Sequence, residues 1–134
     1  MKSSISLFVQ STEDKDRILS SLAEVFSIPN IPHIAEFMEL KGHHGNPVTH
    51  VNLSLKGDEA RGTLQTILER LSEADRDQLL GNLEDYLDER GNLYVRLDKQ
   101  ELCLKRLAMS QSDAVRIVVK PFRGELEELL GSEA

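Results

Sequence analysis

The chain has 134 residues, of which 40% are hydrophobic and 29% are charged, and its formal net charge is −7. This composition supports a folded core and argues against wholesale disorder, and the single cysteine excludes an internal disulfide framework. No apolar run reaches the roughly 20 residues that span a bilayer, so we expect a cytoplasmic protein with no membrane segment.

Hydrophobic periodicity predicts strands and helices that alternate along the chain. Period-two stretches are typical of half-buried strands, and apolar stripes with a period near 3.6 residues are typical of amphipathic helices. In chain order we expect a strand at 5–10, a helix with its stripe at 18–26, strands at 33–41 and 48–56, helices at 58–71 and 79–87, a strand at 93–98, a short helix at 99–106, a strand at 115–120 and an acidic helical segment at 124–134.

Three local signals predict where these elements begin and end. Ser11 and Thr12 offer N-caps for the first helix, and Ser72 with Asp75 resembles a capping box. Gly91 stands where a left-handed helix C-cap belongs.

The alternating strands predict a sheet with one covered face and one open face. We therefore expect an α+β fold, a single two-layer sandwich with a mainly antiparallel sheet and helices on one face. It forms one domain over residues 1–134, with 124–134 as a short acidic tail. The residues expected to face the helices are Ile5, Val9, Val51, Leu53, Val95, Leu97 and Ile117. The residues expected on the open face are Phe8, His50, Asn52, Tyr94, Arg96, Arg116 and Lys120.

The expected open face has the chemistry of a single-stranded RNA platform. Bases stack on exposed aromatic rings, here Phe8 and Tyr94, while cationic groups hold the phosphates. The candidate phosphate contacts are Lys41, His43, His44, Arg96, Lys99, Arg116 and Lys120. The alternative is a solvated sheet face with incidental aromatic residues, or a face covered by a partner.

The densest local signal is the connector Gly42-His43-His44-Gly45-Asn46-Pro47. Its glycines permit positive φ, and its exposed N–H groups and imidazoles could receive a phosphate or a base edge. The alternative is a plain hairpin connector.

A second motif, Asn92 to Gln100, ends a strand with Arg96, Lys99 and Gln100. Arginine and lysine suit phosphate, and glutamine can read a base edge. The alternative is an ordinary polar strand exit, with Asp98 as a helix N-cap.

Catalytic and metal-binding motifs are absent from the sequence. The four histidines match no standard metal spacing, and no phosphate loop, nucleophile elbow or zinc-protease motif is present, so we expect neither a cofactor nor an enzyme. Cys103 stands between leucines and is expected to pack in the interior. The least favoured alternative is a ribonuclease in which His44 and His50 approach across the hairpin.

The net charge conceals segregation along the chain. Residues 69–89 hold eight acidic residues and two arginines, and residues 124–134 hold four acidic residues and no base. Residues 96–123 hold seven basic and three acidic residues. The acidic excess therefore does not argue against RNA, and it predicts a separate acidic side available to a protein partner.

The connector and the second motif together resemble an archaeal family of predicted exosome-associated RNA-binding proteins. The resemblance covers about residues 5–120 and implies a fold similar to the ribosomal protein that binds five-S ribosomal RNA. It places the family loop on 42–47 and the second motif on 96–100. The short acidic end at 124–134 departs from the longer closing helix that the family leads us to expect.

This resemblance implies a small, non-enzymatic RNA-binding protein that assists RNA processing or decay. RNA, the exosome and ribosomal proteins are the implied partners. The alternative from the residues is a protein-interaction module whose acidic segment, residues 69–89, docks on a basic partner. The sequence does not specify the oligomeric state.

Overall fold

The computed structural model describes residues 1–122 and 124–133. Within these residues, antiparallel strands form one sheet in the order β2-β3-β1-β5-β4. The strands are β1 (Lys2–Gln10), β2 (Glu36–Lys41), β3 (Pro47–Lys56), β4 (Leu93–Asp98) and β5 (Ala114–Lys120). The helices are α1 (Lys15–Phe26), α2 (Ile31–Ile34), α3 (Gly57–Arg70), α4 (Glu73–Gly81), α5 (Lys99–Cys103) and α6 (Glu125–Glu133), with a 3-10 helix η1 (Leu83–Tyr86).

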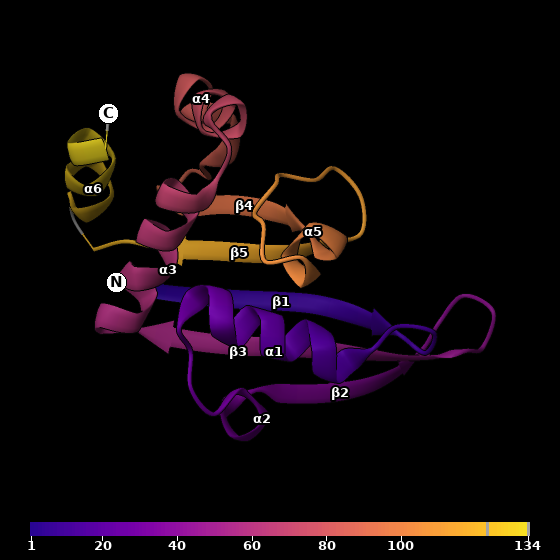
Figure 1. Cartoon of the computed structure of the whole chain (residues 1–134). Coiled ribbons are helices and arrows are strands. Elements are labelled where there is room, and N and C mark those ends of the chain that lie inside the picture. Colours follow the sequence, from indigo (N-terminus) through magenta and orange to yellow (C-terminus); the bar gives the residue numbers. More distant parts are fainter. Residues whose placement is uncertain (123, 134) are drawn as a thin grey trace.

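The fold has two layers, which confirms the α+β sandwich expected from the sequence. Helices α1, α3 and α5 lie on one side of the sheet, and the other side is open (Figure 1). Helix α4 lies beyond the β4 edge, while β2 forms the opposite edge. No helix in the described part of the chain is long and apolar enough to cross a membrane.

The core lies between the sheet and the helices. Ile5 stands directly opposite Leu53 on one side and Ile117 on the other, so the three form a buried row across β3, β1 and β5. Leu22 of α1 and Ile67 of α3 complete the same cluster. Each such side chain contributes about 1.5–3 kcal/mol when it leaves water. All seven residues expected to face the helices are buried, which confirms the predicted facing.

The ends of two early elements differ from the expectation. The N-cap of α1 is Asp14, which accepts a hydrogen bond from the Arg17 N–H, and not Ser11 or Thr12. The strand expected from residue 33 begins at Glu36, because the preceding residues close a short helix.

The third helical stretch is broken, because α4 ends at Gly81 and η1 follows it. Ser72 does cap α4 by accepting from the Asp75 N–H. Gly91 has the expected positive φ of 81°, but it closes a turn after Asp88 and does not cap a helix. The short helix expected at 99–106 ends at Cys103, since Lys105 adopts a left-handed φ of 62°.

The acidic end of the chain folds back onto the core. Leu126 and Leu130 of α6 are buried in the main hydrophobic cluster. Glu125 forms an ion pair with Arg61 of α3 and accepts the Phe122 N–H, and that backbone hydrogen bond lowers the pKa of Glu125. Residues 125–130 are therefore an integrated part of the fold and not a loose tail.

Candidate nucleic-acid interface

The central feature of the open face is a pair of arginines. Arg96 of β4 stands directly opposite Arg116 of β5, so the two side chains leave the same face of the sheet side by side. Both are exposed, and neither guanidinium forms an ion pair with a carboxylate among the described residues. Adjacent like charges destabilise a sheet, so the pair brings two positive charges together with no compensating carboxylate among the described residues.

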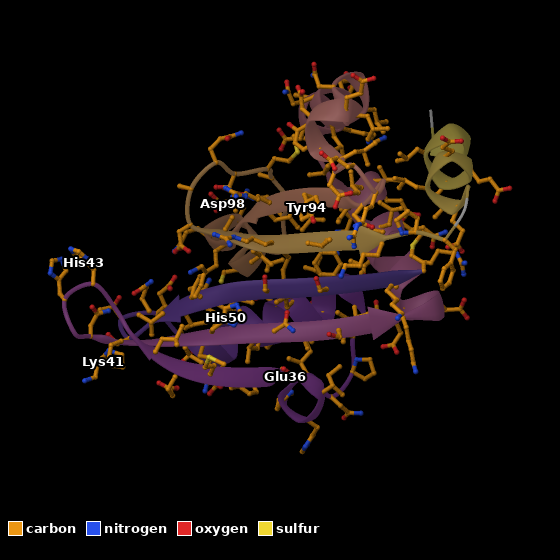
Figure 2. All side chains as sticks on the ribbon, turned by 180° about the vertical axis from the view of Figure 1, so that it is seen from behind. Glu36, Lys41, His43, His50, Tyr94 and Asp98 are labelled. Atoms are coloured by element: carbon orange, nitrogen blue, oxygen red, sulfur yellow. The ribbon has the colours of Figure 1, made fainter. Side chains whose placement is uncertain are left out.

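Aromatic rings lie on both sides of this pair. The rings of Phe8 and His50, opposite each other on β1 and β3, have centroids 4.8 Å apart, and the Arg116 guanidinium lies 6.0 Å from the Phe8 ring. Tyr94 on β4 is 46% exposed. Figure 2 shows Tyr94 and His50 on this open face. The rings and the guanidinium groups therefore occupy one continuous surface.

Tyr94 is held by an acid that the sequence did not single out. The carboxylate of Asp88 accepts N–H groups from Arg90 and Asn92, the Asn92 side-chain amide, and the Tyr94 hydroxyl at 3.1 Å. The Asn92 backbone hydrogen bond, with the other donors, holds the pKa of Asp88 below its ordinary value, whereas the hydrogen bond to Asp88 raises the pKa of Tyr94. The hydrogen bond to Asp88 therefore orients the exposed Tyr94 side chain on the open face.

Three lysines extend the positive surface toward one end of the sheet. Lys2 stands opposite Lys56 on β3 and opposite Lys120 on β5, and all three are exposed. The β2 edge differs, because the register places Glu36 on the open face together with apolar Met38. The open face is thus most basic over β1, β4 and β5.

The expectation that Lys99 contacts phosphate is wrong for this structure. It is only 2% exposed, and its ammonium donates to the Phe8 carbonyl at 2.6 Å, to Glu13 at 2.9 Å and to Asp113 at 2.8 Å. An ammonium has three protons, so these bonds use its full donor capacity. In this structure Lys99 therefore ties the end of β1 to the segment before β5 and offers no donor to RNA.

Two further candidate RNA contacts, Gln100 and Lys41, also lie away from the arginine pair. Gln100 of α5 is exposed near the start of α1, in a shallow hollow that includes Asp14 and Arg17, on the side of the sheet that the helices cover. Lys41 ends β2 and is exposed (Figure 2). Asp98 caps α5 by accepting the Glu101 N–H, as the alternative interpretation of this motif expected.

The connector forms a compact turn beyond the end of the sheet, where Figure 2 places His43. Gly42 donates to the Asn46 carbonyl, and a Cβ added at Gly42 would lie 2.5 Å from Asn46 Oδ1, so a larger residue there would displace the Asn46 side chain. Gly45 has a φ of 79°, a backbone conformation that favours glycine. The turn therefore has a structural reason for Gly45, and His43 and His44 are exposed.

The histidines do not assemble a common site. His43 and His44 contact each other with ring centroids 5.0 Å apart, whereas His50 contacts Phe8. Among the described residues, no group of three or more His, Cys, Asp or Glu side chains could hold a metal ion. Cys103 is half-buried against the core.

Comparison with known proteins assigns the chain to a family. A family model described as RNA binding matches residues 3–121, and the chain is 34% identical over 124 residues to the RNA-binding protein PAB1135 of Pyrococcus abyssi, covering 88% of this chain and 80% of that protein. The chain belongs to this RNA-binding family. An uncharacterized protein of Methanocaldococcus jannaschii, MJ0213, is 27% identical over 125 residues, covering 89% of this chain and 82% of its own length.

Solved structures of archaeal proteins share the fold of this RNA-binding family member. Protein SSO0741 from Sulfolobus solfataricus matches with a TM-score of 0.81 and 23% identity over 100% of both chains. Mth689 from Methanothermobacter thermautotrophicus matches with a TM-score of 0.74 and 27% identity, covering 98% of this chain and 96% of its own. The membership of an archaeal RNA-binding family, which the sequence motifs led us to expect, is therefore confirmed.

Several residues that hold the open face or the neighbouring Lys99 in place were not predicted from the sequence. Asp88 had a detectable signal, because Asp-Glu-Arg-Gly-Asn is typical of a turn in which the aspartate side chain caps the backbone. Lys2 follows the same period-two pattern as Phe8 and could have been assigned to the open face. Glu13 and Asp113 had no signal, since they are far from Lys99 along the chain.

Proposed function

We propose that this chain binds single-stranded RNA on the open face of its sheet, and that the contacting surface is centred on Arg96 and Arg116. The observation that carries the proposal is their direct cross-strand pairing, with no carboxylate partner for either among the residues that the structure describes. Two adjacent guanidinium groups supply positive charge and planar sets of donors that suit the phosphates of a flexible strand. Phe8 and Tyr94 lie beside them as stacking surfaces.

The remaining predicted contacts stand at the periphery of this surface. Lys120 extends the phosphate path toward Lys2 and Lys56, and the loop at 42–46 lies beyond the opposite end of β1, where Asn46 Nδ2 donates to Gln10 at 3.5 Å. We assign them weaker, peripheral contacts. Lys99 and Gln100 are left out of the contacting set, because one is buried and the other lies on the helix-covered side.

Equilibrium binding of a fluorescent single-stranded RNA at low salt tests the proposal. Arg96→Ala and Arg116→Ala should each weaken binding, and each should reduce the slope of log K against log salt by about 0.7, the value for one phosphate contact of a single strand. Arg17→Ala, which removes the same charge from exposed α1, is the matched control and should change neither. No measurable RNA affinity, or equal losses in all three variants, would reject the proposal.

The biological role that we propose is an accessory function in cytoplasmic RNA processing or decay, in association with the exosome. Its support is the family resemblance, together with an acidic side formed by α4, η1 and α6 that leaves the basic face free for RNA. Co-purification from the native host tests it. Exosome subunits that remain bound after nuclease treatment indicate direct docking, whereas their loss indicates a link through RNA, and their absence in both samples contradicts the association.

A further inference from the structure

A groove of about 590 Å³ lies on the open face beside β4. This size falls within the range of small-ligand pockets. Its polar and aromatic lining includes both arginines of the central pair and groups from three other segments. The side chains used in the argument below are Asp85, Tyr86, Tyr94, Arg96, Gln111 and Arg116.

One wall of the groove is fixed by hydrogen bonds from its backbone. Ser110 donates its N–H to the Arg96 carbonyl at 2.9 Å, and Met109 donates its N–H to the Asp75 carboxylate at 2.9 Å. The partly buried bond from Lys99 to Asp113 holds the end of this segment, just before β5. The wall that carries Gln111 is therefore in place before a ligand binds, which reduces the ordering cost of binding.

The groove combines groups of opposite chemistry. Arg96 and Arg116 supply donors for an anion, while the exposed carboxylate of Asp85 can only accept hydrogen bonds when ionised. No ion pair joins Asp85 to either arginine among the described residues. A ligand that fits all of these groups carries an anionic group, a flat ring for Tyr94 or Tyr86, and a hydrogen-bond donor for Asp85.

A nucleotide of RNA has this combination when its base carries an exocyclic amino group. We propose that the groove takes one unstacked base of the bound RNA, and that Asp85 favours adenine, cytosine or guanine over uracil at that position. Carboxylates accept hydrogen bonds from such amino groups, whereas uracil presents two carbonyl oxygens that flank its single N–H and repel a carboxylate. The inference rests on the proposed function, since the arginines hold the backbone of the same strand.

The test compares RNA oligonucleotides that differ at one base. A uridine oligomer and the same oligomer with one central adenosine or cytidine are titrated against the unmodified chain, Asp85→Asn and Glu84→Gln. The unmodified chain should bind the adenosine and cytidine oligomers about tenfold tighter than the uridine oligomer, within the range for one good base contact. Glu84 is the matched control, because it lies on η1, carries the same charge and does not line the groove.

The two variants separate base selection from general electrostatics. Loss of one acidic charge in Glu84→Gln should strengthen the binding of every oligonucleotide by a similar factor and leave the adenosine-to-uridine ratio unchanged. Only Asp85→Asn should also bring the adenosine-to-uridine ratio close to one, because its side-chain amide both donates and accepts. A ratio near one in the unmodified chain, or an equal change of the ratio in both variants, overturns the inference while the proposed RNA face stands. If no oligonucleotide binds at all, the proposed function itself fails.

Discussion

Arg96 and Arg116 are direct cross-strand neighbours on the open face, and no carboxylate in the described part of the chain forms an ion pair with either of them. Opposed like charges weaken strand pairing by a fraction of a kcal/mol to about 1 kcal/mol, so the stability of the sheet does not explain why the two arginines lie together. The same charges would be stabilised by an anion. This opposition between stability and binding is what distinguishes a binding surface from an ordinary solvated sheet face.

The first prediction concerns the stability of the arginine pair. Arg116→Thr should leave the free energy of unfolding unchanged or raise it by up to about 1 kcal/mol, since it removes the repulsion and introduces a residue with high strand propensity. The same variant should bind RNA more weakly. Urea unfolding measures the first effect and RNA titration the second. A variant that loses stability and RNA affinity together would assign Arg116 a structural role instead.

The second prediction concerns buried Lys99. Lys99→Ala should lower the free energy of unfolding by about 3 kcal/mol, because it removes the buried ammonium that pairs with the Glu13 carboxylate and donates to the Phe8 carbonyl. Lys120→Ala removes an exposed lysine and should stay within about 0.5 kcal/mol of the unmodified chain. The measurement is urea unfolding of both variants. If Lys99→Ala unfolded like the unmodified chain but bound RNA poorly, Lys99 would contact RNA directly.

The sequence predicted the faces of four strands and left the fifth ambiguous for a physical reason. Strands such as β1 alternate strictly because only one of their faces is covered. In β2 every residue is exposed, and apolar side chains point to both faces, Phe37 to one and Met38 to the other. Periodicity therefore could not assign that edge strand.

The candidate site was predictable only where its residues follow strand periodicity. Arg116 and Tyr94 were placed correctly on the open face, because they alternate with buried neighbours. The burial of Lys99 could not be predicted, since its partners Glu13 and Asp113 are 86 and 14 residues away along the chain. A lysine in a motif near a strand end has the same local signal whether it is exposed or buried.

The third prediction concerns the pH dependence of the Tyr94–Asp88 pair. Asp88→Asn should lower the pKa of Tyr94 toward its ordinary value of 10.0, because the accepting carboxylate and its negative charge are removed. The asparagine oxygen can still accept the N–H groups that form the turn. Ultraviolet titration of tyrosine ionisation measures the shift, and Tyr94→Phe identifies which of the tyrosine signals belongs to this residue. An unchanged titration would show that Asp88 does not control Tyr94.

The signs of the two pKa shifts define where this pair contributes to stability. The raised pKa of Tyr94 means that its contribution is present below pH 10.0 and is lost as the pH rises through the raised value. The lowered pKa of Asp88 means that its contribution is present above pH 3.8 and is lost as the pH falls through the lowered value. We therefore expect the Asp88→Asn variant to show a smaller loss of stability than the unmodified chain as acid is added.

The fourth prediction concerns stacking on Phe8. Phe8→Leu should weaken RNA binding by about 1–3 kcal/mol, because leucine fills much of the space but offers no ring face to a base. Phe37→Leu is the control, since Phe37 is also half-exposed but lies on the other side of the sheet, where Lys15 covers its ring. Titration of a single-stranded RNA into both variants measures the effect. Equal losses in both variants would argue against stacking at Phe8.

The most direct test of the RNA face is a map of backbone amide shifts during titration with single-stranded RNA. We expect the largest shifts on Tyr94, Arg96, Arg116 and the end of β1 that carries Phe8, with smaller shifts in the 42–46 loop and none along the exposed side of α1. Shifts concentrated on α1 and α3, with β4 and β5 unchanged, would contradict the assignment of the open face as the RNA-binding surface.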